Sequence, residues 1–172
     1  MVIFVLILSC QSKTQKIKTQ LEQFIGKTIV FPDSMTIIKL DTINTILPYY
    51  QEAEFTISTA IDGACGVCVD QLNDWKTFIQ SNATILDKKV KILFFIESYD
   101  FDTFEYLTKD IDFSYPLIFD PKELYIWNNK LPQDKRFQTF LLDKNNKILL
   151  IGSPIDNNKI SELYKKTIVQ SK

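Results

Sequence analysis

The sequence predicts an α/β fold in which helices flank a central mixed sheet, with an N-terminal extension before it. Short β-rich runs alternate with stretches that repeat apolar residues at helical spacing, which is typical of strands joined by helices. Near the carboxyl end, two β-rich runs are separated only by residues 143–146, and this predicts an antiparallel hairpin. The expected order is therefore β-α-β-α-β-α-β-β-α, and the hairpin makes the sheet mixed.

The first ten residues predict an export signal rather than part of the fold. Residues 2–8 are continuously apolar, and the run stops at Ser9 and Cys10. The run is too short to cross a bilayer, which takes about 20 helical residues, but an apolar segment followed by a small residue is typical of a cleaved signal peptide. Residues 7–10 resemble a bacterial lipobox, which implies that residues 1–9 are removed as a lipoprotein signal peptide and that Cys10 carries the lipid. The alternative is a buried N-terminal strand that ends in a cysteine.

The segment that follows is expected to be a tether, and the rest of the chain one domain. Residues 10–20 are rich in Lys, Gln and Thr, a composition that favours a solvated linker. No repeat or low-complexity segment follows, so residues 21–172 are expected to form a single domain. Its first elements are predicted to be a helical turn at residues 21–25 and short strands at residues 27–31 and 36–40.

Near the centre of this domain the spacing of apolar residues changes from that of a strand to that of a helix. Residues 54–61 are β-rich and mostly apolar, which predicts a buried strand. The spacing then becomes helical, and one face of the predicted helix carries Cys68, Leu72, Trp75 and Ile79. The CxxC motif at residues 65–68 therefore lies where a strand gives way to a helix.

The remaining elements follow from the same two periods. The sequence predicts a strand at residues 90–96, a helix at 102–109, an extended segment at 116–119, a helix at 122–129, strands at 137–142 and 147–151, and a last helix at 155–169. Asp120 and Pro121 are expected to open the helix at 122–129 as cap and first-turn proline. Asp156 is expected to cap the last helix, and the tryptophans Trp75 and Trp127 are expected in the core.

Composition and charge exclude several classes of function. Lys and Arg number 20 and Asp and Glu number 21, so a net charge of -1 gives no general attraction to nucleic acid. Glycines number only 4, and no Gly-rich phosphate-binding motif occurs. The chain has no histidine, which excludes Ser-His-Asp and Cys-His catalysis and histidine-based metal sites. The remaining chemistry depends on three cysteines, Cys10, Cys65 and Cys68.

The spacing of Cys65 and Cys68 suits thiol–disulfide exchange, which needs an exposed thiolate and a second thiol that resolves the mixed disulfide. At a helix N-terminus the unpaired N–H groups and the helix dipole favour the thiolate, so Cys65 is the expected nucleophile. Cys68 lies on the apolar face and is the expected resolving thiol. One alternative is a static disulfide, although so short a loop constrains the unfolded chain little. Another is a zinc half-site, for which no histidine or further cysteine remains in the mature domain, so no metal or cofactor is expected.

The strand, the CxxC motif, the helix and the late hairpin together resemble the thioredoxin fold over about residues 50–170. Residues 115–120 and 139–148 are similar to the exported, membrane-tethered branch of that superfamily. This branch includes the TlpA-like thiol–disulfide oxidoreductases, the AhpC/TSA family and thioredoxin-like lipoproteins, and residues 61–68 agree best with the lipoproteins. The resemblance implies that the two cysteines of the motif form a redox-active disulfide.

Several positions differ from the patterns of this superfamily. The tryptophan before the first cysteine is Ala64, and the buried carboxylate six residues before that cysteine is Thr59. The cis-proline before the hairpin strand aligns with Phe137 or Gln138, where a trans bond is expected because a non-proline cis bond costs about 2.5–4 kcal/mol. A peroxidase site is not favoured, because the threonine of its motif aligns with Asp62, which is expected to be a turn residue.

The sequence thus predicts a thiol–disulfide oxidoreductase that acts on thiols of exported proteins and is recycled by a further redox partner. The lipid on Cys10 predicts attachment to a membrane of the bacterial envelope, inner or outer, with the domain in the periplasm. No nucleic-acid partner is expected. The alternative function is a non-catalytic thioredoxin-fold module that binds another protein of the cell envelope.

Overall fold

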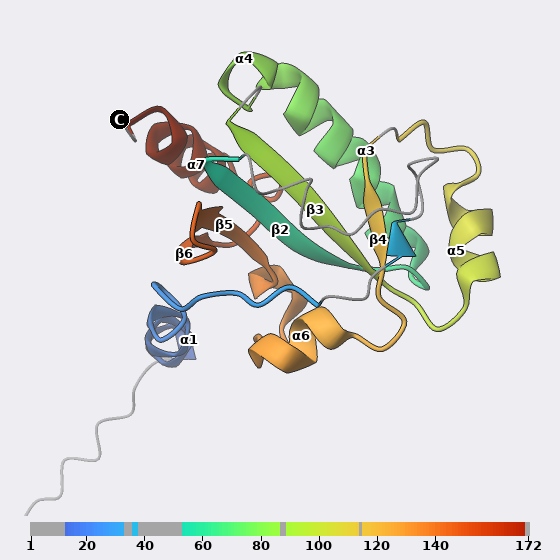
Figure 1. Cartoon of the computed structure of the whole chain (residues 1–172), viewed down its shortest axis with the longest axis horizontal. Coiled ribbons are helices and arrows are strands. Elements are labelled where there is room, and N and C mark those ends of the chain that lie inside the picture. Colours follow the sequence, from blue (N-terminus) through green and yellow to red (C-terminus); the bar gives the residue numbers. More distant parts are fainter. Residues whose placement is uncertain (1–12, 33–35, 38–52, 87–88, 114, 171–172) are drawn as a thin grey trace, which may run out of the picture.

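A 6-stranded sheet with the strand order β1-β4-β3-β2-β5-β6 forms the centre of the molecule (Figure 1). The computed structural model describes residues 13–32, 36–37, 53–86, 89–113 and 115–170. The strands are β1 (Thr36–Ile37), β2 (Phe55–Asp62), β3 (Val90–Glu97), β4 (Leu117–Phe119), β5 (Thr139–Asp143) and β6 (Ile148–Ile151). β3 runs parallel to both β2 and β4, whereas β1, β5 and β6 pair antiparallel with their neighbours. The sheet is therefore mixed and carries the predicted hairpin.

Helices cover both faces of this sheet (Figure 1). They are α1 (Lys13–Glu22), α3 (Gly66–Ser81), α4 (Ala83–Leu86), α5 (Phe101–Thr108), α6 (Leu124–Asn129) and α7 (Asn158–Gln170), with a 3-10 turn at Lys135–Phe137. Helices α3 and α7 pack on one face, and α6 packs on the other. From β2 to α7 the order matches the predicted one, with the short helix α4 and the 3-10 turn added.

A hydrophobic layer lies on each face of the sheet, because successive side chains of a strand point to opposite faces. In β3, Phe94 faces the layer under α3, where the ring of Trp75 meets it edge-on at 5.3 Å between centroids. The next residue, Phe95, faces the opposite layer and stacks on Tyr125 of α6 at 4.0 Å. Successive side chains of a strand point to opposite faces, so a strand buried on both faces is apolar throughout. This explains the continuous apolar run that predicts β3.

The N-terminal part contains a helix that was not predicted and lacks one of the expected strands. Residues 10–20 were expected to be a solvated tether, and the chain is helical from Lys13 to Glu22. Residues 27–31 contact the sheet through an isolated bridge between Thr28 and Lys147 rather than as a strand. The strand expected at 36–40 is described only as β1, and the rest of it lies outside the described residues.

Three further details differ from the prediction. The strand expected from residue 137 begins at Thr139, because residues 135–137 form the 3-10 turn. The last helix is opened by Asn157, whose side chain accepts a hydrogen bond from the Lys159 N–H at 2.8 Å, rather than by Asp156. Trp127 is not in the core: it is 60% exposed, because the six-residue helix α6 buries Tyr125 and Ile126 on its other side.

The predicted signal peptide (residues 1–9) and Cys10 lie outside the described residues. Within the described ranges, none of the helices combines the length and the apolar composition that crossing a bilayer requires.

Candidate functional site

The CxxC motif lies at the carboxyl end of β2, where the chain turns into α3. The carboxylate of Asp62 accepts a hydrogen bond from the Ala64 N–H at 3.1 Å, so the predicted turn role of Asp62 is confirmed. The Gly63 N–H donates to the carbonyl of Glu97 at 2.8 Å, and a Cβ at Gly63 would come within 2.7 Å of Ile96 Cγ2. The close approach of the two central strands therefore requires glycine two residues before the motif.

Cys65 is the N-cap residue of α3. Its backbone is extended, with φ -106° and ψ 108°, and its Sγ accepts a hydrogen bond from the Cys68 N–H at 3.4 Å. The carbonyl of Cys65 accepts the first bond of the helix, from the Val69 N–H at 2.9 Å. The sulfur of Cys65 thus lies where unpaired N–H groups and the positive end of the helix dipole favour a thiolate. This environment suits a nucleophile.

Cys65 and Cys68 form a disulfide, and both residues are partly exposed. Cys68 packs against the same hydrophobic layer as Leu72 and Trp75, so it lies on the apolar face of α3 as its spacing predicts. Val67, between the two cysteines, is 77% exposed. The disulfide therefore has one flank toward solvent and one toward the interior.

A cavity of about 120 Å³ adjoins Cys68. Its lining includes Thr59, Asp62, Cys68, Trp75, Lys135 and Thr139. Thr59 stands where thioredoxins carry a carboxylate, and its hydroxyl is hydrogen-bonded to that of Thr139 at 2.7 Å. The hydroxyl of Ser153 also lines the cavity and has no hydrogen-bond partner among the described residues. A polar cavity of this size has room for water, which would satisfy such a group.

Three charged side chains form a cluster beside this cavity, and two of them, Asp62 and Lys135, line it. Lys135, on the 3-10 turn before β5, donates to the Asp62 carboxylate at 2.9 Å. Its Nζ also lies 3.6 Å from Oε2 of Glu97, the last residue of β3. The side chain of Glu97 is only 8% exposed, and its Oε1 has no hydrogen-bond partner among the described residues. A lysine thus connects an acid at the surface with an acid that is nearly buried.

Burial and neighbouring charges shift the pKa values of this cluster. Desolvation raises the pKa of Glu97 to about 7. The positive charge of Lys135 lowers this pKa, and the negative charges of Glu123 and Asp120 raise it further. Desolvation lowers the pKa of Lys135, but its hydrogen bond to Asp62 and the charge of Glu97 outweigh that effect and raise it above the usual value. Glu97 therefore changes its charge near neutral pH while Lys135 remains a cation.

Sequence reasoning missed both Glu97 and Lys135. The available signal was the position of Glu97, which is the first acidic residue after the apolar run of β3. The carboxyl ends of parallel neighbouring strands meet at one edge of a sheet, and Asp62 and Glu97 are register partners there. Nothing in the sequence pattern places Lys135 at the same edge.

The segment before β5 is held without a proline at the position that faces the motif. No cis peptide bond occurs among the described residues, so the expected trans geometry is confirmed for Phe137 and Gln138. Gln138 is buried, its Nε2 donates to the carbonyl of Pro132 at 2.8 Å, and its own carbonyl accepts from the Ala60 N–H at 3.3 Å. Arg136 pairs with Asp134 in the same segment.

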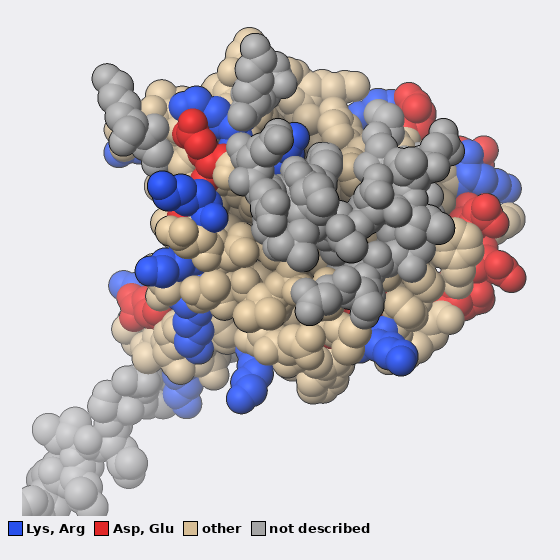
Figure 2. Space-filling model, in the orientation of Figure 1, with Lys and Arg blue, Asp and Glu red and all other residues tan. Residues whose placement is uncertain are grey.

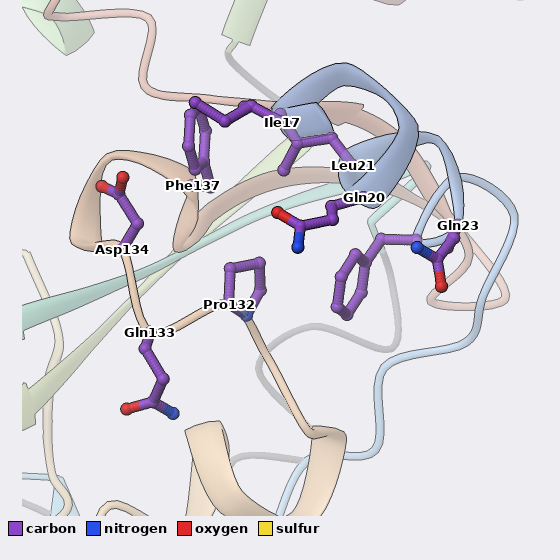
Figure 3. Close-up of a pocket in the computed structure, with 9 residues that line it drawn as sticks. Ile17, Gln20, Leu21, Gln23, Pro132, Gln133, Asp134 and Phe137 are labelled. Atoms are coloured by element: carbon purple, nitrogen blue, oxygen red, sulfur yellow. The ribbon is translucent and has the colours of Figure 1, made fainter. Parts of the chain in front are cut away.

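The same segment lines a second, larger pocket of about 320 Å³ (Figure 3). Ile17 and Leu21 of α1 line it together with Pro132 and Phe137 of the segment before β5 (Figure 3). Ile17 and Leu21 are four residues apart, so they share one face of the helix. One face of α1 and the segment before β5 therefore line this pocket together.

Charge on the face drawn in Figure 2 is uneven but mixed. Acidic side chains gather over α5, whereas Lys and Arg lie mainly along the edge formed by α1, β6 and α7. The described residues contain no group of three or more Cys, Asp or Glu side chains placed to hold a metal ion. Among the described residues, the disulfide and the charged cluster beside it form the candidate site.

Comparison of the sequence with models of known protein families gives no match. A search among curated proteins also gives none.

Solved structures, in contrast, match over most of the chain. A protein from Chlorobium tepidum provisionally named DsbE, a thiol:disulfide interchange protein, superposes with a TM-score of 0.60 at 13% identity, covering 84% of this chain and 97% of its own. The thioredoxin domain of a thiol-disulfide oxidoreductase from Bacteroides vulgatus gives 0.58 at 11% identity, covering 81% and 96%. The C-terminal domain of an uncharacterized protein from Bacteroides fragilis gives 0.55 at 24% identity, covering 83% and 96%. The thioredoxin-like fold expected from the sequence is confirmed.

Proposed function

We propose that this protein is a thiol–disulfide oxidoreductase whose redox centre is the disulfide between Cys65 and Cys68. The observation that carries the proposal is the position of Cys65 as the N-cap of α3, with its sulfur bonded to Cys68 within the first helical turn. Such a position favours the thiolate that exchange requires. The names of two structural neighbours, an interchange protein and an oxidoreductase, support the same chemistry.

The exchange proceeds in two displacement steps. In the oxidising direction, a partner thiolate attacks Cys65 Sγ, a mixed disulfide forms, and the bond to Cys68 breaks to leave a thiolate there. A second partner thiolate then attacks the mixed disulfide, so the partner leaves as a disulfide and both cysteines are reduced. In the reducing direction, the Cys65 thiolate attacks a partner disulfide and Cys68 resolves the intermediate. Two electrons pass between the dithiol and the disulfide in either case.

The location proposed for this activity is the bacterial envelope, with exported proteins as substrates. The apolar run that ends at Cys10 supports export and lipid attachment, and disulfide chemistry suits an oxidising compartment. The expected result is a mature protein in the membrane fraction whose N-terminal residue, Cys10, carries the added mass of a lipid. A Cys10→Ser chain that still fractionates with the membrane would contradict it.

The activity is tested by exchange with insulin and glutathione as probes. Cys65→Ser should reduce the rate of insulin reduction by dithiothreitol to the uncatalysed level, because the attacking sulfur is gone. Cys68→Ser should accumulate a mixed disulfide between Cys65 and glutathione, seen as an added mass on the intact protein. Cys10→Ser is the matched control and should keep the full rate, since Cys10 precedes the domain.

The competing function is a binding module in which the disulfide is inert. The hydroxyl pair at Thr59 and the absence of a cis-proline before β5 favour it, because both depart from the thioredoxin pattern. The reduction potential of the disulfide separates the two functions. A value below about -300 mV, typical of structural disulfides, together with no exchange with either probe, would refute the oxidoreductase proposal.

A further inference from the structure

The exchange chemistry leaves a proton to be managed on the inner side of the disulfide. When a partner thiolate attacks Cys65, the disulfide breaks and its electron pair stays on the sulfur of Cys68, which packs against the core. A thiolate in such a place is unstable unless a cation or a proton reaches it. The residue in the position of the thioredoxin carboxylate is Thr59, whose hydroxyl is already bonded to Thr139 and does not titrate near neutral pH.

We infer that the cluster of Lys135, Asp62 and Glu97 serves this purpose: Lys135 stabilises the Cys68 thiolate, and Glu97 supplies the proton that converts it to a thiol. The inference deepens the proposed exchange function and rests on it. Lys135 and Cys68 line the same 120 Å³ cavity. Among the residues that the structure describes, no other lysine lines that cavity, and its arginine, Arg136, is paired with Asp134.

The proton balance of this step is complete. Lys135 gives a proton to the Cys68 sulfur across the cavity, which has room for bridging water. The protonated carboxyl of Glu97, 3.6 Å from Lys135 Nζ, returns a proton to the lysine. The products are a Cys68 thiol, a Lys135 ammonium and a Glu97 carboxylate. When the disulfide forms again, the steps reverse and Glu97 recovers its proton.

Burial and neighbouring charge place Glu97 in the required state. Its Oε1 is buried with no hydrogen-bond partner among the described residues, which is costly for a carboxylate and tolerable for a neutral acid. The charged groups that act on Glu97 are Lys135, Glu123 and Asp120, and burial raises its pKa to about 7. Asp62 fixes the lysine from the solvent side at 2.9 Å. Asp156, which also lines the cavity, has a raised pKa because of burial and the charge of Asp74.

Glu97 passes its proton to Cys68 through Lys135, so its effect must appear in the pH dependence of the Cys68 titration. The test uses the full chain carrying Cys10→Ser and Cys65→Ser, so that the remaining thiol is Cys68. The thiolate absorbance of this chain is titrated with pH. Lys135→Met should raise the pKa of Cys68 by about 1 unit, because a nearby cation is lost. Glu97→Gln should lower it by about half a unit, because a negative charge that disfavours the thiolate is removed.

Matched controls separate this coupling from damage to the fold. Lys144→Met and Glu105→Gln change exposed residues of the same types and should leave the Cys68 titration unchanged. Lys135→Arg keeps the positive charge, so the Cys68 pKa should stay close to that of the chain with Lys135. Shifts in the same direction for Lys135→Met and Glu97→Gln, or values equal to the controls, would overturn the inference.

The titration needs no exchange partner, so its outcome is independent of the insulin assay. If Lys135→Met and Glu97→Gln leave the Cys68 pKa unchanged while the parent enzyme is active in the insulin assay, the inference is refuted and the proposed function stands. Loss of insulin reduction by Cys65→Ser bears only on the proposed function.

Discussion

Glu97 is a carboxylic acid held almost out of water at the end of a central strand. Its folded pKa is about 7, raised mainly by desolvation, against a usual value of 4.5. Between these two values the folded state binds more protons at this site than the unfolded state, so stability falls as pH rises. The cost is absent below about pH 4.5 and complete above about pH 7. Glu97 therefore destabilises the protein at neutral and alkaline pH.

Replacing Glu97 by glutamine removes this cost while it keeps the size and shape of the side chain. We expect Glu97→Gln to raise the free energy of unfolding by about 1–3 kcal/mol at pH 8 and to change it little at pH 4. Urea denaturation at the two pH values measures the difference. Glu105→Gln, at an exposed position of α5, should show no such pH dependence. An equal effect of Glu97→Gln at both pH values would contradict the assignment.

The sequence was sufficient to identify the cysteines but not the groups that surround them. Cys65 and Cys68 are recognisable because their spacing and the change from strand to helix are local. Glu97 and Lys135 are not, because their proximity depends on the pairing of β2 with β3 and on the path of the chain before β5. One buried charged residue does not produce a repeating pattern of apolar and polar residues, so the sequence alone does not reveal its burial.

At the scale of elements, α6 shows how a short helix is fixed by one side chain. Asp120 is 2% exposed, and its two carboxylate oxygens accept hydrogen bonds from the Leu124 and Tyr125 N–H groups, both at 2.8 Å. The sequence predicted Asp120 as the cap of a helix beginning near residue 122. The helix instead begins at Leu124, because the chain first turns through Glu123, which has φ 52°.

Asp120→Asn should therefore loosen α6. The amide can accept one of the two hydrogen bonds, but its NH₂ group then faces the second N–H. We expect the free energy of unfolding to fall by about 1–3 kcal/mol, measured by urea denaturation at pH 7. Asp110→Asn, at an exposed position after α5, is the control and should be neutral. A neutral result for Asp120→Asn would show that the carboxylate is not what holds α6.

Helices and strands with regularly spaced apolar residues were predicted well, and short or mostly polar helices were not. β2, β3, the hairpin strands and α3 follow from apolar spacing over 4 to 16 residues. α1 was missed because it has only two apolar residues, Ile17 and Leu21, and the residues that line a pocket with them, Pro132 and Phe137, are distant in the sequence (Figure 3). The exposure of Trp127 was missed for a similar reason, since the orientation of a six-residue helix is decided by what it packs on.

At the scale of the whole molecule, stability comes from the sheet and its two hydrophobic layers rather than from the disulfide. Trp75 and Phe94 anchor one layer, and Phe95 and Tyr125 anchor the other. The disulfide joins residues with a sequence separation of only 3. A loop this short removes little entropy from the unfolded chain, about 2 kcal/mol at most in the chain-entropy account. A redox centre must be able to open without unfolding the protein that carries it.

Reduction should therefore leave the fold intact. We expect the Tm of the reduced chain to lie within about 8 °C of that of the oxidised chain, since 1 kcal/mol corresponds to about 2–4 °C for a protein of this size. Calorimetry with and without dithiothreitol measures the difference in the Cys10→Ser chain, and the far-UV circular dichroism should be the same in both states. A chain carrying both Cys65→Ser and Cys68→Ser should show no response to the reductant. Cooperative unfolding on reduction would instead mean that the bond is a structural staple, and the two layers alone would then be insufficient to hold the sheet together.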